Sequence, residues 1–150
     1  MSQKTLEDLK NVMKKLRSPQ GCPWDKEQTP ESLTPFAVEE ALELEDAIHN
    51  KGTEDIIEEL GDLLFQVVFQ AQMAAEKKLF TMDDVIDNLT CKMIERHPHV
   101  FQKNKTPLTS NEVKNKWEQD KNKKQTPRST FTMPKNFPAL LSAYKIGKKS

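Results

Sequence analysis

The chain has 150 residues, which suits one ordinary domain around one core. Its 23 basic and 23 acidic side chains give a formal net charge of zero, which argues against a dedicated nucleic-acid-binding protein because such proteins usually carry a basic excess. The two cysteines lack the spacing of a metal site, so we expect no structural zinc. The sequence has no signal-peptide core and no apolar run of the roughly 20 residues that span a bilayer. We therefore expect a soluble cytoplasmic protein.

The first predicted helix covers residues 5–16, where leucine, valine and methionine recur with the period of a helix. Residues 17–25 interrupt this period with proline and glycine, and they predict a loop with Trp24 at its centre. Trp24 is a candidate for stacking on a base, although a tryptophan is more often a packing residue.

Two longer helices are predicted next, separated by a short turn. The first has Thr29 as its N-cap and Pro30 as its first helical residue, and it runs to about Asn50. Thr53 is expected to cap the second helix, whose apolar residues repeat with helical period to about Lys78. Because the turn is short, these helices should lie antiparallel, with their acidic residues face to face.

Two further helices are predicted in the second half of the chain. Thr81 is the expected cap of a helix that ends near His97, where a proline follows. Residues 108–113 repeat the same capping pattern and open a helix that carries Trp117.

The sequence contains no pattern typical of a β-strand. Neither a period-two run nor an Asn-Gly or Asp-Gly hairpin turn occurs, so we expect an all-α bundle. A single domain is expected over residues 1–124. Residues 125–150 are polar and contain three prolines, which predicts a linker followed by a short amphipathic segment.

Four acidic residues interrupt the apolar stripes of the two antiparallel helices. Glu40 and Glu43 are three apart, as are Glu59 and Asp62, so each pair projects from one helix face. Burying an unpaired carboxylate is costly or shifts its pKa until it neutralises, which indicates a bound cation. Oxygen ligands favour Mg²⁺, Mn²⁺ or Ca²⁺. Most Glu-rich helices are simply solvated, and the spacing of Glu39 alone requires no metal.

Lys92 and Arg96 are four residues apart on the next predicted helix, so both project from one face. Beside a metal cluster they are candidates for a phosphate clamp, whereas by themselves they suit an ordinary solvated basic face. The chain has no Gly-rich phosphate loop and no Gly-x-Ser-x-Gly nucleophile motif.

Together these motifs resemble the MazG family of nucleoside triphosphate pyrophosphohydrolases. The similarity covers residues 5–124, and residues 133–141 resemble the connector to a second MazG domain in longer members. The segments that carry it are distinctive and occur in family order: 21–29, 39–43, 59–69, 92–101 and 117–118.

The resemblance implies an all-α, dimeric protein with a four-helix core. It also implies Mg²⁺-dependent cleavage of a nucleoside triphosphate between the α and β phosphates, with Mn²⁺ as a possible substitute metal. The products would be a nucleoside monophosphate and pyrophosphate. Carried over by motif, Glu40, Glu43, Glu59 and Asp62 would hold the metal, Lys92, Arg96, Trp117 and Trp24 would contact the nucleotide, and Glu39 would orient the attacking water.

Two other interpretations stay open. The chain could be a catalytically weak module for dimerisation or regulation within a larger MazG protein, or it could hydrolyse a specialised substrate such as phosphoribosyl-ATP. The preferred base and sugar, the number of metal ions and the general base also stay open. A dimer is expected independently from the wide apolar face of the second long helix, which includes Val67, Val68, Phe69, Ala71 and Met73.

Overall fold

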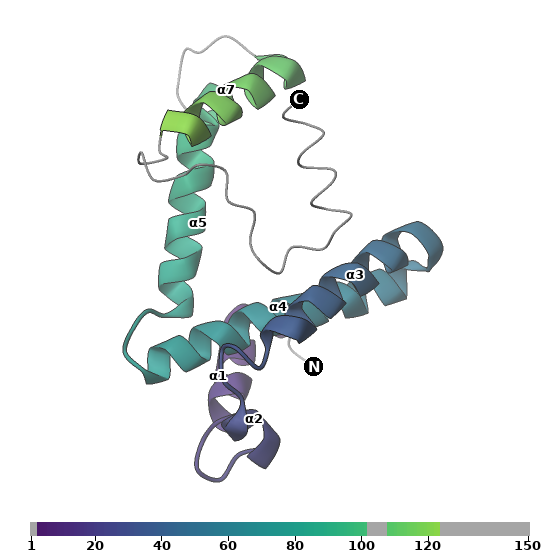
Figure 1. Cartoon of the computed structure of the whole chain (residues 1–150), viewed down its shortest axis with the longest axis vertical. Coiled ribbons are helices and arrows are strands. Elements are labelled where there is room, and N and C mark those ends of the chain that lie inside the picture. Colours follow the sequence, from purple (N-terminus) through teal and green to yellow (C-terminus); the bar gives the residue numbers. More distant parts are fainter. Residues whose placement is uncertain (1–2, 102–107, 124–150) are drawn as a thin grey trace. The chain divides into compact units, whose positions relative to one another are not determined.

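The structure is a computed structural model that describes residues 3–101 and 108–123, with residues 117–123 described by their backbone alone. All regular structure in these residues is helical, which confirms the predicted all-α class (Figure 1). The predicted linker and amphipathic segment at residues 125–150 lie outside the described residues. The helices are α1 (Leu6–Leu16), α2 (Pro23–Glu27), α3 (Thr34–Asn50), α4 (Thr53–Glu76), α5 (Met82–Arg96), α6 (Pro98–Phe101) and α7 (Ser110–Lys123).

The chain divides into two compact units, Met1–Lys92 and Met93–Ser150. The first unit holds α1 to α4 and most of α5, and it contains the predicted acidic site. The second unit holds the last turn of α5 together with α6 and α7. Within the described residues, no helix is both long enough and apolar enough to cross a membrane.

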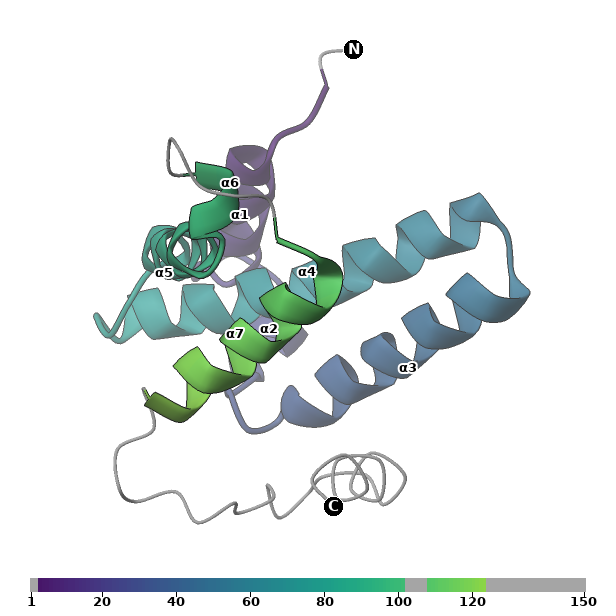
Figure 2. The ribbon, with the colours of Figure 1, turned by 90° about the horizontal axis from the view of Figure 1, so that it is seen from above.

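An antiparallel hairpin of α3 and α4 confirms the predicted arrangement of the two long helices. Figures 1 and 2 show these helices side by side, and they pack along each other within the first unit. The Lys51 N–H donates to the Ala47 carbonyl at 3.1 Å and so closes the end of α3. Thr53 is not the cap of α4, contrary to the prediction. Gly52 is the cap, and its N–H donates to the carboxylate of Asp55 at 3.1 Å.

The start of α3 also differs from the prediction, because the helix begins at Thr34 rather than after Thr29. The Thr29 N–H donates to Ser32 Oγ at 3.0 Å, and the Ser32 N–H donates to Thr29 Oγ1 at 3.2 Å. These reciprocal bonds hold a separate turn that competes with the helix for the same residues. Pro35 is the proline in the first turn of α3, a position where its missing N–H costs nothing.

The core of the first unit forms where α1 packs on α4. It is built from Met13, Leu33, Val68, Phe69 and Met73, all of which are almost completely buried. Part of the apolar face that suggested a dimer is therefore internal. Val68, Phe69, Ala71 and Met73 belong to this core, and of the five residues named for that face only Val67 is exposed.

Arg17 connects the loop after α1 to the end of α4 through hydrogen bonds. Its Nε and one terminal nitrogen each donate to a different carboxylate oxygen of Glu76 at 2.8 Å, and the other terminal nitrogen donates to the carbonyls of Asp25 and Gln28. The guanidinium also lies 5.5 Å from the centre of the Phe69 ring. The hydrogen bonds from Arg17 lower the pKa of Glu76. Within the predicted loop, Pro23 opens the short helix α2 that carries Trp24.

Gly21→Ala should destabilise the protein, because this loop passes directly against the end of α1. A methyl group on Gly21 would lie 2.0 Å from the Leu16 carbonyl oxygen and 2.5 Å from that of Lys15. Both obstacles are backbone atoms, so relief requires the loop to move. Overpacking of this kind costs about 1–3 kcal/mol. Urea unfolding should show this loss for Gly21→Ala but a much smaller change for Gly61→Ala, because a methyl group there meets nothing within 4 Å. Equal stabilities of Gly21→Ala and wild type would contradict the packing.

Candidate functional site

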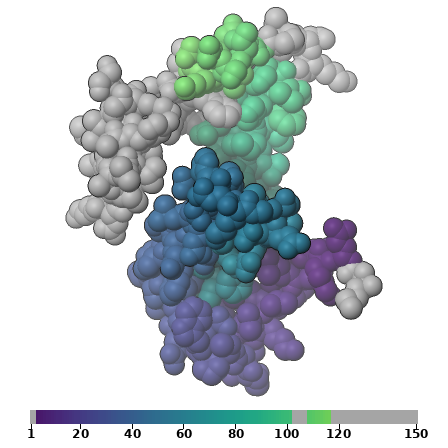
Figure 3. Space-filling view, turned by 90° about the vertical axis from the view of Figure 1, so that its right-hand side faces the viewer, coloured from purple at the N-terminus to yellow at the C-terminus, as the bar shows by residue number. Residues whose placement is uncertain are grey.

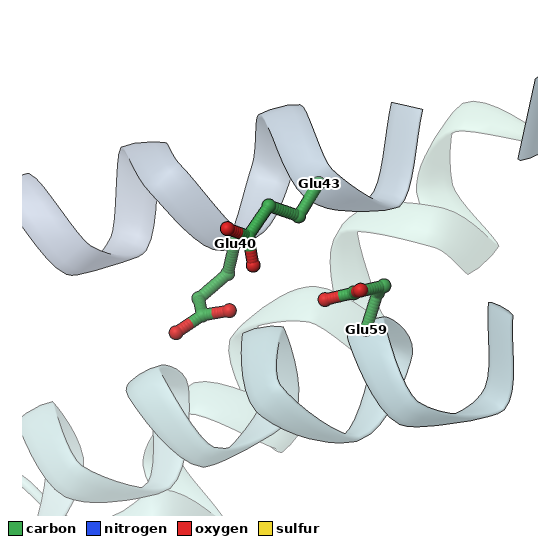
Figure 4. A group of neighbouring side chains, drawn as sticks. All are labelled: Glu40, Glu43 and Glu59. Atoms are coloured by element: carbon green, nitrogen blue, oxygen red, sulfur yellow. The ribbon is translucent and has the colours of Figure 1, made fainter. Parts of the chain in front are cut away.

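Three carboxylates meet between the two helices of the hairpin. Glu40 and Glu43 project from α3 and Glu59 projects from α4, as Figure 4 shows, and each offers an oxygen within 4.8 Å of the other two. The i, i+3 spacing places the α3 pair on one face, and the antiparallel packing of α4 brings Glu59 opposite that face. The structure therefore brings together three of the four acids expected to form a metal site.

The electrostatics of this trio favour a positive partner. Glu59 is only 9% exposed. Burial raises the pKa of Glu40 first, and the neighbouring charges of Asp62, Glu43, Glu59 and Glu39 raise it further. Such a shift means that the carboxylates repel one another when all of them are ionised.

Asp62 lies close to the trio without being part of it. Its side chain is exposed, and its carboxylate is not among the three whose oxygens converge. It is nevertheless the first charge after burial that raises the pKa of Glu40. The fourth expected acid therefore lies on the next turn of α4, close enough for its charge to raise the pKa of Glu40.

Lys51 supplies a positive charge from the turn between α3 and α4. Its Nζ lies 3.6 Å from a carboxylate oxygen of Glu59 and 3.8 Å from one of Asp46. Nothing in the local sequence pattern around Lys51 points to the acids. Lys51 lies close to Glu59 because of the conformation of the turn between α3 and α4. Spacing along the chain does not reveal that conformation.

An open groove of about 730 Å³ runs beside the trio. Glu39, Glu43, Glu59 and Lys51 line it together with apolar residues of α3. The turn that joins α3 and α4 faces the viewer in the space-filling view (Figure 3). Glu39 is exposed and borders the groove, so it lies on the side from which solvent reaches the acids.

Trp24 stands against the helix that carries Glu40 and Glu43. It is 50% exposed, and its ring meets Phe36 edge to face with the ring centres 6.1 Å apart. Phe36 precedes Glu40 by one helical turn. The structure thus places an accessible aromatic ring near the start of the acid-bearing helix.

The expected nucleotide contacts on α5 and α7 are divided between the two units. Lys92 belongs to the first unit, where it is half-buried and lines a pocket with Phe80, Asn88 and Leu89. Arg96 and Trp117 belong to the second unit. The side chain of Trp117 lies outside the described residues.

The raised pKa of Glu40 predicts how stability depends on pH in the metal-free protein. A carboxyl whose pKa is higher in the folded state stabilises the fold most below its ordinary value of about 4.3, and this contribution is lost as the pH rises through the folded value. Gln imitates the protonated form at every pH. The free energy of unfolding can be measured in urea with a chelator present. As the pH rises from 4 towards neutrality, the value for Glu40→Gln should increase relative to the value for wild type. A difference that is independent of pH would contradict this.

Comparisons with known proteins agree on one family. Residues 28–101 match the family model described as the MazG nucleotide pyrophosphohydrolase domain. A nucleoside triphosphate pyrophosphohydrolase of Escherichia coli K12 is 42% identical over 149 residues, which is 96% of this chain and 56% of that protein. The nucleoside triphosphate pyrophosphohydrolase/pyrophosphatase MazG of Thermotoga maritima is 56% identical over 95 residues, 63% of this chain and 37% of that protein.

Two further comparisons concern an uncharacterised relative and a solved structure. The uncharacterised protein YabN of Bacillus subtilis is 44% identical and covers 93% of this chain, which spans only 29% of YabN. This chain therefore spans between 29% and 56% of the length of these three relatives. A crystal structure of a MazG-related protein from Thermotoga maritima shares the fold, with a TM-score of 0.63 and 24% identity over 78% of this chain and 99% of that one.

Proposed function

Because this chain belongs to the MazG family, we propose that it hydrolyses nucleoside triphosphates between the α and β phosphates, releasing a nucleoside monophosphate and pyrophosphate. The observation that carries this proposal is the convergence of Glu40, Glu43 and Glu59 from two helices to within 4.8 Å. The names of the relatives support the substrate class. We further propose one domain over residues 1–124 that acts on free cytoplasmic nucleotides, without a nucleic-acid or membrane partner.

The donor atoms fit Mg²⁺ as the required metal, with Mn²⁺ as a substitute. The trio and Asp62 offer only carboxylate oxygens, which hard divalent cations prefer. Mg²⁺ is usually held by one or two carboxylates together with water and substrate phosphates, and the open groove beside the trio leaves room for both. We propose that Glu40, Glu43, Glu59 and Asp62 hold the metal.

The remaining site residues have roles that follow from their chemistry. When bound, Mg²⁺ would offset phosphate charge and polarise the phosphoryl group. Glu39, exposed at the groove, would orient the attacking water and accept its proton. Lys92 and Arg96 would contact the triphosphate through charge-assisted hydrogen bonds and stabilise the charge that develops on the pyrophosphate. Trp24 and Trp117 would contact the nucleoside.

A panel of nucleoside triphosphates incubated with Mg²⁺ tests the proposal, with the products identified by ³¹P NMR. Equal amounts of monophosphate and pyrophosphate are expected, and a chelator should stop their release. Diphosphate and inorganic phosphate would indicate a different bond cleavage. Nucleotide binding without any product would support the alternative, a catalytically weak dimerisation or regulatory module.

We also propose a homodimer, which the exposed apolar side chains of the hairpin support. Leu42 on α3 and Ile57, Leu60 and Leu64 on α4 are all more than two fifths exposed. Ile57, Leu60 and Leu64 share one face of α4 by their spacing, and an exposed apolar face of this kind usually marks an interface. Light scattering should give twice the mass of the chain, whereas Leu60→Glu should shift the population towards monomer. A monomeric mass for wild type across a hundredfold concentration range would contradict the proposal.

A further inference from the structure

A third and smaller pocket lies in the first unit, on the side of the hairpin that faces the start of α5. It has a volume of about 280 Å³ and is lined by residues of α3, α4 and the segment that opens α5. This size is below the roughly 300–1,000 Å³ typical of pockets for drug-sized ligands, so it suits a single ring system. The residues that matter for its chemistry are Ala37, Leu63, Gln66, Val67, Phe80 and Val85.

Gln66 is the unusual member of this wall. It is only 8% exposed, and its side-chain Oε1 is buried without a hydrogen-bond partner among the described residues. Buried amide oxygens are nearly always paired, because leaving one unpaired costs free energy. Gln70, one turn further along α4 on the same pocket, shows the ordinary situation, since its amide donates to the Pro30 carbonyl at 3.0 Å. The pocket therefore has one side-chain amide that donates a hydrogen bond and one whose buried oxygen has no partner among the described residues.

The pocket begins one helical turn from the acidic trio on both helices of the hairpin. Leu63 follows Glu59 by four residues and Gln66 follows it by seven, so at 1.5 Å per residue they lie about 6 Å and about 10 Å further along α4. On α3, Ala37 precedes Glu40 by three residues. A ligand whose phosphates are held at the acids through the proposed Mg²⁺ could therefore reach the pocket across the length of one sugar.

Phe80 and Val85 connect this pocket to Lys92. Both residues also line the adjoining pocket that Lys92 borders. The apolar pocket thus has a carboxylate cluster beside it on the hairpin and a lysine beside it on α5. A nucleotide has the matching parts, namely a phosphate chain that needs cations and a flat ring with a polar edge.

We propose that this pocket binds the base of the nucleoside triphosphate and that Gln66 determines base selectivity by accepting a hydrogen bond from the base edge. The inference rests on the proposed function, because it assumes that the phosphates bind at the acids. The apolar wall and the Phe80 ring cover the faces of the base. The amino or ring N–H group of the base supplies the donor that Gln66 Oε1 lacks.

Binding can be tested without turnover by NMR of the ¹⁵N-labelled protein. The side-chain amide signal of Gln66, assigned with the variant Gln66→Met, should shift when a nucleoside monophosphate and Mg²⁺ are added. Pyrophosphate with Mg²⁺ should leave that signal in place. If none of the four common monophosphates moves the Gln66 signal, the base does not bind there and the proposal is overturned.

Kinetics then test selectivity. Gln66→Leu should lower kcat/KM for the preferred triphosphate by roughly 5- to 150-fold, the range for one lost buried hydrogen bond, and lower it less for the others. The ratio between the best and the worst base should therefore collapse. Gln72→Leu is the matched control, because this amide lies on the same helix outside the pocket and donates to Glu76 at 3.0 Å. An equal loss for all bases would overturn the proposal.

Thermal stability separates a binding role from a structural one. Gln66→Met replaces an unpaired buried acceptor with an apolar group of similar size, so the ligand-free Tm should stay level or rise. A marked fall in Tm would mean that the amide has a structural partner, which overturns the proposal. If wild type hydrolyses no triphosphate, the proposed function is wrong. The NMR titration still shows whether a base binds in the pocket.

Discussion

Glu40→Gln should abolish pyrophosphate release while leaving the fold intact. Glu40 belongs to the carboxylate trio, and its pKa is raised by burial and by neighbouring carboxylates. Removing its charge would take away a proposed metal ligand and relieve repulsion at the same time. Changes to residues that merely support metal ligands cost about 10- to 100-fold, so loss of a ligand should exceed about 100-fold in turnover.

The same variant makes a prediction about stability that does not depend on turnover. A metal that binds only the folded state stabilises it by about 2.7 kcal/mol when present at 100 times its Kd. Wild type should therefore show a higher Tm with Mg²⁺ than with a chelator. Glu40→Gln should be at least as stable as wild type in the chelator and should gain much less from Mg²⁺.

Glu45→Gln is the control for this comparison. Glu45 lies on the same helix with an exposed side chain, and its carboxylate is 3.8 Å from His49. This variant should keep both the turnover and the full Mg²⁺ effect. If Glu40→Gln responded to Mg²⁺ as fully as wild type does, Glu40 would not be a ligand, and the proposed metal site would be wrong.

Most helix boundaries could be predicted from the sequence because their signals are local. Thr5, Thr81 and Thr109 each cap a helix by bonding with the acid three residues later. Thr29 was predicted to cap α3 because Pro30 follows it, but it pairs with Ser32 instead. A capping pattern shows that a side chain can bond to the backbone at the start of a helix. If the same side chain bonds to another nearby residue instead, the helix begins elsewhere.

The acidic site was predictable for a different reason. Spacing alone places Glu40 and Glu43 on one face, and a short turn forces Glu59 to face them. Lys51 and Gln66 could not be found in this way. Lys51 is notable because its Nζ lies close to Glu59, and Gln66 is notable because its buried Oε1 lacks a hydrogen-bond partner among the described residues. Neither feature can be read from spacing along the chain.

Apolar periodicity had a related limit in the prediction of the interface. It correctly marked one face of α4 as buried, but it could not tell burial within the chain from burial against a second copy. Phe69 and Met73 prove to be internal, whereas Leu60 and Leu64, earlier on the same helix, stay exposed. The packing of α1 on α4 helps to bury the first of these two sets within the core.

The proposed phosphate clamp, Lys92 and Arg96, should be separable by mutation from the proposed metal site. Lys92→Ala and Arg96→Ala should keep the stabilisation by Mg²⁺, because neither side chain can bind a cation. Each should weaken the interaction with the triphosphate. A charge-assisted hydrogen bond is worth roughly 1.5–3 kcal/mol, which corresponds to a loss in kcat/KM of about 10- to 150-fold.

The parameter that changes shows when the contact forms. A rise in KM at constant kcat would mean that Lys92 holds the substrate equally in the ground state and the transition state, whereas a fall in kcat would mean that it acts on charge that develops during cleavage. Lys14→Ala is a suitable control, because Lys14 is an exposed lysine on α1. If Lys92→Ala behaved like this control in both parameters, Lys92 would be an ordinary basic surface residue, and the charge on the leaving pyrophosphate would need another partner from this chain.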